Sequence, residues 1–515
     1  VLIYNFAYLC QCFKKYNVLG TNLKDIMLKR VRIALTALLL LAAVGVNAQV
    51  TTASMAGKVT DASNEPIIGA TVQAVHQPSG SRYGTVTNVD GRYSIQGMRT
   101  GGPYRVEISY IGYQTVIYKD ITLQLGEVYN LNVEMSESSE LLNEVIVTAA
   151  KTKFTAEKTG ATTNISSAQI TQLPTVNRSI SDIARLSPYA NGMSFAGGDG
   201  RSTNFTIDGA NFNNNFGLSS NLPGGGNPIS MDAIEEVQVV VAPFDVRQTN
   251  FIGGGINAIT KSGTNTFRGT AYTYYRNQDM RGNRINGEDL GARSDESKTT
   301  YGFTLGGPII KNKLFFFVNY EKEKTPGEVI KYRAREDGEE AKGMVSRTLK
   351  SDMEKVYNHL KDKYGYDAGS YTSFPADEEN TKILARIDWN ITDRHRLSLR
   401  YNNTKNTAWN APNGNSSDTG YRLNNTYRVG TQSMAFANSM YSMDNKVQSW
   451  ATDLNSRFTD KISNQLLFTY TNIEDMRGTN SSPFPFIDIM AGKDENGNQI
   501  LEPYMSAGYE LFTYN

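Results

Sequence analysis

The chain has 515 residues and a formal net charge of +1 at pH 7. This length exceeds what one ordinary domain requires, and the balanced charge gives no reason to expect a nucleic-acid partner. The sequence contains 45 glycines and 29 tyrosines but few long apolar runs, a mixture that favours short strands and turns over helices.

The one long apolar run, Ile33–Val46, lies near the N-terminus. It follows a cluster of basic residues and ends among small residues, as secretory signals do. It is also shorter than the ~20 residues that a helix needs to cross a bilayer. We therefore predict a signal peptide at residues 27–48, cleaved between Ala48 and Gln49 and preceded by an upstream extension at residues 1–26.

Cleavage at that point would remove Cys10 and Cys12, the two cysteines of the chain. The exported part is therefore expected to contain no disulfide. No cysteine follows the predicted cleavage site, which argues against a lipid-anchored protein.

Residues 49–135 are predicted to form a small all-β domain. Short strands recur at the spacing of a β-sandwich and are separated by turn residues. Asn64-Glu65-Pro66 and Asp90-Gly91 supply the backbone angles that two of these turns need. The predicted strands are 54–59, 70–75, 84–86, 93–95, 104–110, 114–118 and 128–135.

Three runs in this region, Gly57–Asp61, Pro66–Val72 and Asp90–Ile95, together resemble the carboxypeptidase regulatory-like domain. The resemblance implies an immunoglobulin-like sandwich with a carbohydrate-binding-like fold. It does not imply catalysis, because a zinc peptidase needs histidine and glutamate ligands. The only histidine of this region, His76, is predicted to lie at the surface.

Residues 136–152 are predicted to be a linker. A charged start leads into a short β-branched run that ends the linker. Such a run can add to the sheet edge of another protein through backbone hydrogen bonds; the alternative is an ordinary strand. The run resembles the TonB box, the strand on which the TonB energising complex of the inner membrane pulls. The candidate TonB box consists of Glu144, Val145, Ile146, Val147, Thr148 and Ala149.

Residues 153–265, called the plug segment below, are predicted to be mixed α/β. Serine residues precede two short helical patterns at 166–172 and 180–186, where they can act as N-caps. Strands are expected at 205–208 and 237–241.

Three runs of this segment resemble the plug of TonB-dependent receptors: Ile207–Gly209, Ile234–Val237 and Gly253–Gly263. The last run also approaches a phosphate-binding P-loop. Thr260 stands where that motif requires glycine, and the pattern of a strand follows instead of a helix, so we reject the P-loop. The plug-motif residues that the resemblance assigns are Asp208, Gly209, Glu235, Val237, Gly254, Gly255, Asn257, Thr260 and Lys261.

From Thr266 onward, apolar and polar residues alternate with a period of two. That pattern fits either a half-buried soluble sheet or a membrane barrel. Short turns on one side and long polar connections on the other favour an outer-membrane barrel. We predict a transmembrane antiparallel β-barrel over residues 266–515. Its hairpins are expected at 300–307 with 313–320 through a turn that contains Pro308, at 384–391 with 396–403, and at 448–458 with 464–472. The polar stretch 321–383 is expected to be a solvated loop.

Two runs, Phe267–Tyr272 and Gly306–Phe317, resemble the Oar-like branch of TonB-dependent receptors. That family closes its barrel with 22 strands, whereas about seven are counted here by alternation. The chain is therefore expected to be an incomplete barrel, C-terminally truncated.

The fold class expected is mainly β: a sandwich, a mixed plug, and the first strands of a barrel. The function that the resemblance implies is TonB-dependent uptake of a large or scarce ligand across the outer membrane, with the sandwich in the periplasm. The ligand class stays open between glycan, peptide and metal chelate, and a surface lipoprotein partner would leave no mark in the sequence. No cofactor is expected.

Two alternatives to a transporter are an adhesin and an enzyme. An adhesin on the same barrel would use the long loops to grip a surface and would not need an energiser strand. An enzyme is disfavoured, because His76, His359 and His395 lie far apart in sequence and no cysteine follows the predicted cleavage site.

Overall fold

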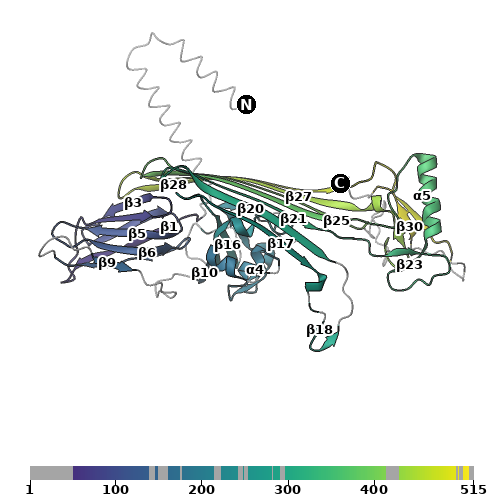
Figure 1. Cartoon of the computed structure of the whole chain (residues 1–515), viewed down its shortest axis with the longest axis horizontal. Helices are drawn as coiled ribbons and strands as arrows, with labels where there is room; N and C mark the ends of the chain where they lie inside the picture. The colour runs from purple at the N-terminus through teal and green to yellow at the C-terminus, as the bar shows by residue number, and fades with distance from the viewer. Residues whose placement is uncertain are drawn as a thin grey trace, which may run out of the picture. The chain divides into compact units, whose positions relative to one another are not determined.

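The computed structural model describes residues 50–137, 145–148, 161–173, 175, 177–213, 222–241, 248, 253–280, 282, 284–289, 296–412, 428–493, 497 and 503–509. The predicted signal peptide and its cleavage site at Ala48 and Gln49 lie outside these residues. Within them, a sandwich, a mixed sheet with two short helices and a sheet of long strands follow one another (Figure 1). No helix in this part of the chain is both long and apolar enough to span a bilayer.

Two sheets form the sandwich, as predicted. One contains β1 (Ala53–Asp61), β4 (Arg92–Met98), β7 (Val128–Asn130) and β8 (Val133–Met135). The other has the order β3-β2-β5-β6-β9, with β2 (Thr71–His76), β3 (Ser81–Val86), β5 (Gly101–Ser109), β6 (Val116–Leu123) and β9 (Val145–Thr148). Alternate side chains of each sheet, among them Val59, Val72 and Val106, are fully buried between the two, as the period of a strand requires. Gly91 has a φ of 71°, the left-handed conformation that its turn needs.

The plug segment forms a five-stranded sheet of order β10-β15-β16-β13-β14 with two short helices. The strands of this sheet are β10 (Ala161–Ser166), β13 (Asn204–Ile207), β14 (Ala210–Asn211), β15 (Ile234–Val241) and β16 (Gly254–Thr260). A separate two-stranded sheet pairs β11 (Ala190–Asn191) with β12 (Ser194–Phe195), and the segment also has the 3-10 turns η1 (Gly200–Ser202) and η2 (Met231–Ala233). Helix α3 (Ser167–Gln172) begins after Ser166, whose backbone N–H donates to the Gln169 side chain at 3.0 Å. Helix α4 (Ile180–Ala184) begins after Ser179. The two predicted serine caps therefore stand where the helices begin.

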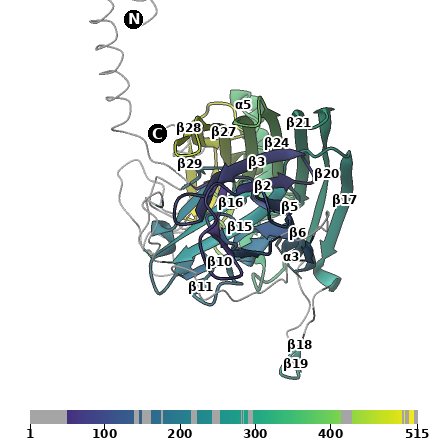
Figure 2. The same cartoon turned by 90° about the vertical axis from the view of Figure 1, so that its left-hand side faces the viewer.

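Seven long strands make up a further sheet, called the barrel sheet, in the order β17-β20-β21-β24-β25-β27-β28. They are β17 (Arg268–Asn277), β20 (Ser297–Ile310), β21 (Leu314–Thr325), β24 (Glu378–Asn390), β25 (His395–Asn410), β27 (Tyr441–Arg457) and β28 (Ser463–Gly478). Every neighbouring pair is antiparallel. The sheet curves around the plug strands β15 and β16 and, over the described residues, is not closed (Figures 1 and 2).

The barrel sheet exposes its apolar face and buries its polar face, which is the reverse of a sheet in a soluble protein. On β24, Ile387 and Trp389 are 42% and 45% exposed, whereas Arg386 and Asp388 between them are 8% and 1% exposed. On β25, Leu399 is 41% exposed and Arg400 is 7% exposed. An apolar outer face and a polar, covered inner face are what a strand needs when one side meets lipid.

Two details of the barrel prediction are wrong. Pro308 does not lie in the turn; it belongs to β20 and pairs with Phe315, beside a register shift between Pro308 and Ile310. A proline is tolerated there because an irregular ladder does not need its missing N–H. The strands also extend well beyond the predicted limits, because their polar ends carry no alternation for a sequence pattern to detect.

The prediction of a solvated loop at 321–383 is wrong as well. Strand β21 continues to Thr325, and Lys350–Tyr364 forms helix α5, which ends at Gly365 with a φ of 65°. The long connections pack into a subdomain, called the loop subdomain, whose core includes Met353, Leu360 and Phe436. Its other elements are β22 (Arg333–Arg335), β23 (Val345–Leu349), β26 (Met434–Ala435), η4 (Ala437–Ser439), β29 (Ile487–Met490) and β30 (Pro503–Ala507). The connection after β17 carries η3 (Gln278–Met280), β18 (Arg284–Ile285) and β19 (Glu288–Asp289).

Candidate functional site

The plug-motif residues Asp208 and Gly209 form the tight turn between β13 and β14. Their φ angles are 51° and 80°, as a two-residue hairpin with both central residues at positive φ requires. Asp208 is only 2% exposed. Its carboxylate accepts hydrogen bonds from Thr260, at 3.0 Å from the backbone nitrogen and 2.6 Å from Oγ1. The structure thus brings Asp208 and Thr260, which are far apart in sequence, into direct contact.

Two arginines of the barrel sheet face this turn. Arg386 of β24 and Arg400 of β25 are paired in register, so both side chains point to the same face. The Asp208 carboxylate lies 3.8 Å from Arg386 Nη1 and 3.5 Å from Arg400 Nε. Arg386 also donates to the carbonyl oxygen of Thr260 at 2.5 Å. The plug segment is therefore bound to the barrel wall through ionic contacts at this turn.

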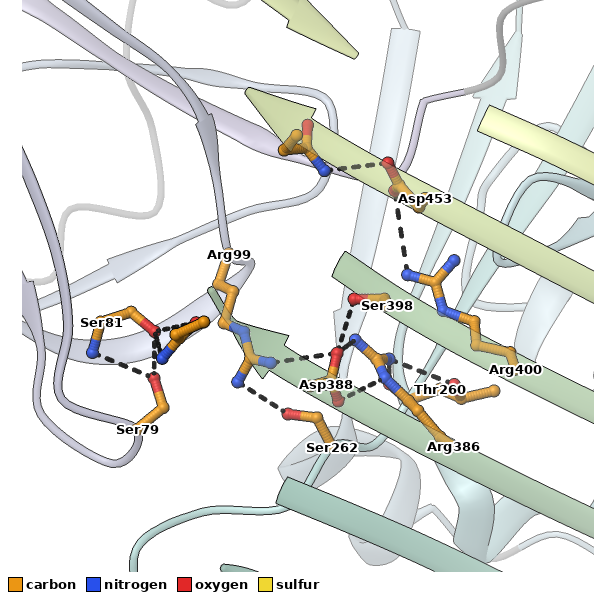
Figure 3. A network of polar contacts seen from close by, with 12 residues as sticks. Ser79, Ser81, Arg99, Thr260, Ser262, Arg386, Asp388, Ser398, Arg400 and Asp453 are labelled. Carbon is orange, nitrogen blue, oxygen red and sulfur yellow. Dashed lines mark hydrogen bonds and ion pairs between the residues drawn. The ribbon is translucent and has the colours of Figure 1, made fainter. Parts of the chain in front are cut away.

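Asp388 joins the sandwich to the same network. Arg386 binds its carboxylate in a bidentate way, at 2.8 and 2.9 Å, and Ser398 donates to it at 2.6 Å. Arg99, from the turn between β4 and β5, approaches the same carboxylate at 3.0 Å and donates to Ser262 at 3.3 Å (Figure 3). One side chain of the sandwich thus contacts both the barrel sheet and the end of the plug segment.

Asp453 of β27 closes the network on its other side. Arg400 Nη2 lies 3.9 Å from its carboxylate, and Thr51, ahead of β1, donates to it at 2.7 Å. Gln465 of β28 donates to the same carboxylate at 3.1 Å.

The network contains equal numbers of the two charges. Its carboxylates are Asp208, Asp388 and Asp453, and its guanidinium groups are Arg99, Arg386 and Arg400. Buried ion pairs of this kind stabilise a structure little compared with apolar packing, but loss of one member leaves an uncompensated charge that costs about 3–5 kcal/mol. We therefore expect the loss of one member to weaken the docking of the plug segment, although the intact network adds little to its stability.

A second group of polar contacts joins the plug segment to the barrel sheet. Glu321 of β21 and Lys382 of β24 form an ion pair of 2.9 Å with both residues almost fully buried. Ser230 of the plug segment donates to Glu321 at 2.8 Å, and Tyr272 of β17 donates to it at 2.9 Å. Nearby, Thr404 of β25 donates to the carbonyl oxygen of Pro228 at 2.7 Å.

Most other plug-motif residues serve the packing of the plug sheet. Val237 is fully buried in the plug core. Gly254 lies where a Cβ atom would come within 2.7 Å of the Phe195 side chain. Asn257 accepts from Thr206 at 2.8 Å across the sheet. Gly255 is buried in β16, and the backbone N–H of Lys261 donates to Ala233 at 2.8 Å. Because Gly254 and Gly255 lie within a strand, the structure has no glycine loop at this point to hold a phosphate.

Burial shifts the pKa of two neighbouring glutamates of β15. Burial raises the pKa of the Glu235 carboxyl above its usual value. Burial also raises the pKa of Glu236 to about 7, against hydrogen bonds that lower it. Those bonds come from the backbone N–H of Leu125 at 3.0 Å and from Asn164 at 3.0 Å. Leu125 follows β6 of the sandwich, so Glu236 is a polar contact between the sandwich and the plug segment.

The candidate TonB box is placed on the sandwich. Glu144 and Ala149 lie outside the described residues, but Val145–Thr148 forms β9, which pairs in parallel with β6. The pairs run from Val116 with Val145 to Lys119 with Thr148.

The prediction of a surface position for His76 is wrong. The residue is 6% exposed, and its Nδ1 lies 2.7 Å from Ser79 Oγ. Burial, with a further contribution from Arg99, lowers the pKa of His76 to about 3, so the ring is neutral at pH 7. The described part of the chain contains no group of three or more histidine, cysteine or acidic side chains arranged to hold a metal.

Comparisons with known proteins agree with this geometry. Residues 54–136 match the family model of the carboxypeptidase regulatory-like domain, and residues 259–330 match that of an outer membrane beta barrel domain. The TonB-dependent transporter Oar of Myxococcus xanthus is 25% identical over 376 residues, which cover 68% of this chain and 33% of Oar. This chain is homologous to a TonB-dependent transporter. It spans about a third of the length of that relative, and the barrel match supports its placement in the outer membrane.

Solved structures give weaker likenesses. The outer membrane transporter YddB from Escherichia coli is 16% identical, with a TM-score of 0.42 over 62% of this chain and 39% of that one. The siderophore receptor PirA from Pseudomonas aeruginosa is 15% identical, with a TM-score of 0.38 over 62% and 42% of the two chains. TM-scores this low carry no conclusion about the function of this chain.

The ionic network was not predicted from the sequence. A signal was present, because Arg386, Asp388 and Arg400 occupy the polar positions of strongly alternating strands. A full charge at an inward position of a barrel strand needs a partner of opposite charge, because burial of an unpaired charge costs much free energy. Which charges meet depends on the register between strands and on the docking of the plug segment, and neither can be obtained from alternation.

Proposed function

We propose that this chain takes part in the TonB-dependent, energised uptake of a large or scarce ligand across the outer membrane, with the sandwich in the periplasm. The observation that carries the proposal is a plug segment held against the polar inner face of a sheet whose outer face is apolar and exposed. A plug inside a lipid-embedded wall blocks passive flow and must be displaced before a ligand can pass.

The plug segment is built to move as a unit. Its own core, which includes Phe205, Val237 and Ile256, is fully buried. Its contacts with the barrel sheet combine hydrogen bonds and ion pairs, at Asp208 and Ser230 among others, with apolar packing against Phe317, Leu384 and Val447. Water entering the lumen can replace the polar contacts and screen their charges, whereas the apolar packing against the barrel sheet has no substitute in water and must be broken by force.

The candidate TonB box supplies a point of attachment for force. A short β-branched strand can pair with the sheet edge of a partner through backbone hydrogen bonds that do not depend on its sequence. The partner proposed is TonB. Because the plug segment follows Val145–Thr148 in the chain, a pull on that strand reaches the plug segment once the strand is free.

The loop subdomain fits the role of a receptor surface, because its own core keeps the connections of the barrel in fixed positions. The ligand class proposed is a glycan, a peptide or a metal chelate, and a surface lipoprotein is a further partner compatible with this arrangement. Exposed apolar side chains such as Trp389, Trp450 and Phe468 are proposed to contact outer-membrane lipid. No step of this function needs covalent chemistry.

The test is a deletion of residues 144–149 in the complete gene that contains this chain, expressed in an outer-membrane host. The matched control deletes residues 138–143, an equal length of the same linker. The measurements are growth on candidate nutrients and binding of those nutrients at the cell surface.

Loss of uptake with binding retained, seen in the first deletion and not in the control, is the expected result. Uptake and binding that both survive the first deletion would refute residues 144–149 as the energiser strand. Binding that is retained while uptake never exceeds that of a strain lacking the gene would refute the transport proposal and favour an adhesin, which needs no energiser strand.

A further inference from the structure

Strand β9, which contains most of the candidate TonB box, is the outermost strand of a sheet in the sandwich. The sheet has the order β3-β2-β5-β6-β9. Four consecutive residue pairs join β9 to β6, from Val116 with Val145 to Lys119 with Thr148. Without β9, β6 would be the edge of this sheet. The strand proposed to bind an outside partner is therefore already paired with a domain of its own chain.

The pairing has a clear physical basis. An edge strand presents unpaired N–H and C=O groups and accepts any strand that fits. β9 consists of Val145, Ile146, Val147 and Thr148, all β-branched and therefore suited to an extended conformation. In a parallel ladder, alternate backbone groups of a strand point to one neighbour, so one edge of β9 is occupied by β6.

The strand that holds β9 is itself fixed to the plug segment. Leu125, two residues after the end of β6, donates its backbone N–H to Glu236 at 3.0 Å. Its carbonyl oxygen accepts from Asn164 at 3.1 Å and from Gln238 at 2.5 Å. Leu125 is also fully buried, in a cluster with Val50 and Ile259. A pull on β9 while it is paired is therefore resisted by the sandwich and its anchors.

We propose that the sandwich is a clasp that holds the candidate TonB box on β6 and must release it before an energising partner can use it. The inference rests on the function proposed above and adds a regulatory step to it. The partner binds only the fraction of molecules in which β9 is free, so its apparent dissociation constant is the intrinsic constant divided by that fraction. Any signal that loosens the β6–β9 pairing raises the availability of the box.

The test locks the clasp with a disulfide. Lys119→Cys and Thr148→Cys replace two residues that are paired in register, and Lys119 is exposed, so its loss does not disturb the core. Cys10 and Cys12, the two native cysteines, are first replaced by serine in the complete protein. A matched control disulfide, Thr71→Cys with Val86→Cys, joins two exposed, paired residues of β2 and β3 that do not touch β9.

The probe is the purified C-terminal domain of the host's TonB, and the measurement is its binding to the detergent-solubilised protein before and after reduction. In the locked variant we expect oxidation to weaken binding by at least about tenfold and reduction to restore it. In the control variant and in each single-cysteine variant, oxidation should change binding by less than about twofold.

Three results would overturn the clasp. Equal binding before and after reduction of the locked variant would show that TonB takes β9 from its outer edge while it is still paired, and the transport function would stand. Failure of the disulfide to form would show that β9 does not lie on β6. Absence of TonB binding in the unmodified protein as well would remove the proposed function together with the clasp.

Discussion

Replacement of Asp208 by asparagine tests whether the ionic network holds the plug segment on the barrel wall. The substitution keeps the shape of the side chain and an oxygen that can accept from Thr260. It removes the negative charge that lies 3.8 Å from Arg386 and 3.5 Å from Arg400. The network is then left with one more guanidinium than carboxylate.

The size of the effect follows from these distances. In a medium of effective dielectric about 20, attraction at such separations is about 4–5 kcal/mol per pair before desolvation is subtracted. Removal of one member of a buried ion pair costs about 3–5 kcal/mol. Arg386 retains its bidentate contact with Asp388, so we expect the low end, about 3 kcal/mol, or about a 150-fold larger population of the undocked state.

The assay is native-state hydrogen exchange, read by mass spectrometry on peptides that contain β13 and β16. Amides that exchange through undocking should do so about 150-fold faster in Asp208→Asn than in the unmodified protein. The control is Asp199→Asn, which removes an exposed carboxylate paired with Arg201 and should leave exchange of β13 and β16 unchanged. An acceleration of less than about threefold in Asp208→Asn would refute the view that the network controls docking.

Three further predictions concern other parts of the molecule. Because burial raises the pKa of Glu236 from 4.5 to about 7, this carboxyl keeps its proton to a higher pH in the folded state than in the unfolded state. Its contribution to the free energy of unfolding should be fully present below pH 4.5 and should fall by about 3 kcal/mol as the pH rises through 7. Guanidinium unfolding between pH 4.5 and 8 should show this slope. Glu236→Gln should remove the part that Glu236 contributes and leave the part due to Glu235, whose pKa burial also raises; an unchanged slope would assign it to other groups. Gly254→Ala should lower the stability of the plug segment by about 1–3 kcal/mol, because the added Cβ would come within 2.7 Å of Phe195. The control in thermal unfolding is Gly430→Ala, where the added Cβ meets open space. Equal melting temperatures of the two variants would contradict the prediction. Leu360 is 4% exposed in the core of the loop subdomain, and Leu360→Ala should destabilise that subdomain by about 2–5 kcal/mol. The variant should bind less ligand at the cell surface while it remains in the outer membrane. Unchanged binding would show that the loop subdomain does not form the ligand-binding surface.

Local patterns in the sequence predicted the sandwich, the two short helices of the plug segment and the long strands of the barrel sheet, in this order. A two-residue period predicts strands whatever they pack against, because successive side chains of a strand point to opposite faces. Serine before an apolar helical pattern, as at Ser166 and Ser179, marks where a helix begins. The alternation of Arg386, Ile387, Asp388 and Trp389 likewise indicated the faces of the barrel sheet before any register was known.

Contacts between distant segments depended on the tertiary structure. His76 is a polar residue on a short strand, and only the packing of the sandwich makes it a buried, neutral side chain. Helix α5 and the core around Leu360 were missed because their apolar residues gain partners only from three separate connections of the barrel.

Asp208 and Arg386 are separated by about half of the plug segment and three strands of the barrel sheet, and β9 could have paired with any compatible edge. A sequence determines strands through interactions between neighbours along the chain. The partners of a charge or of a sheet edge are chosen by docking, in which burial of a charge demands an opposite charge nearby.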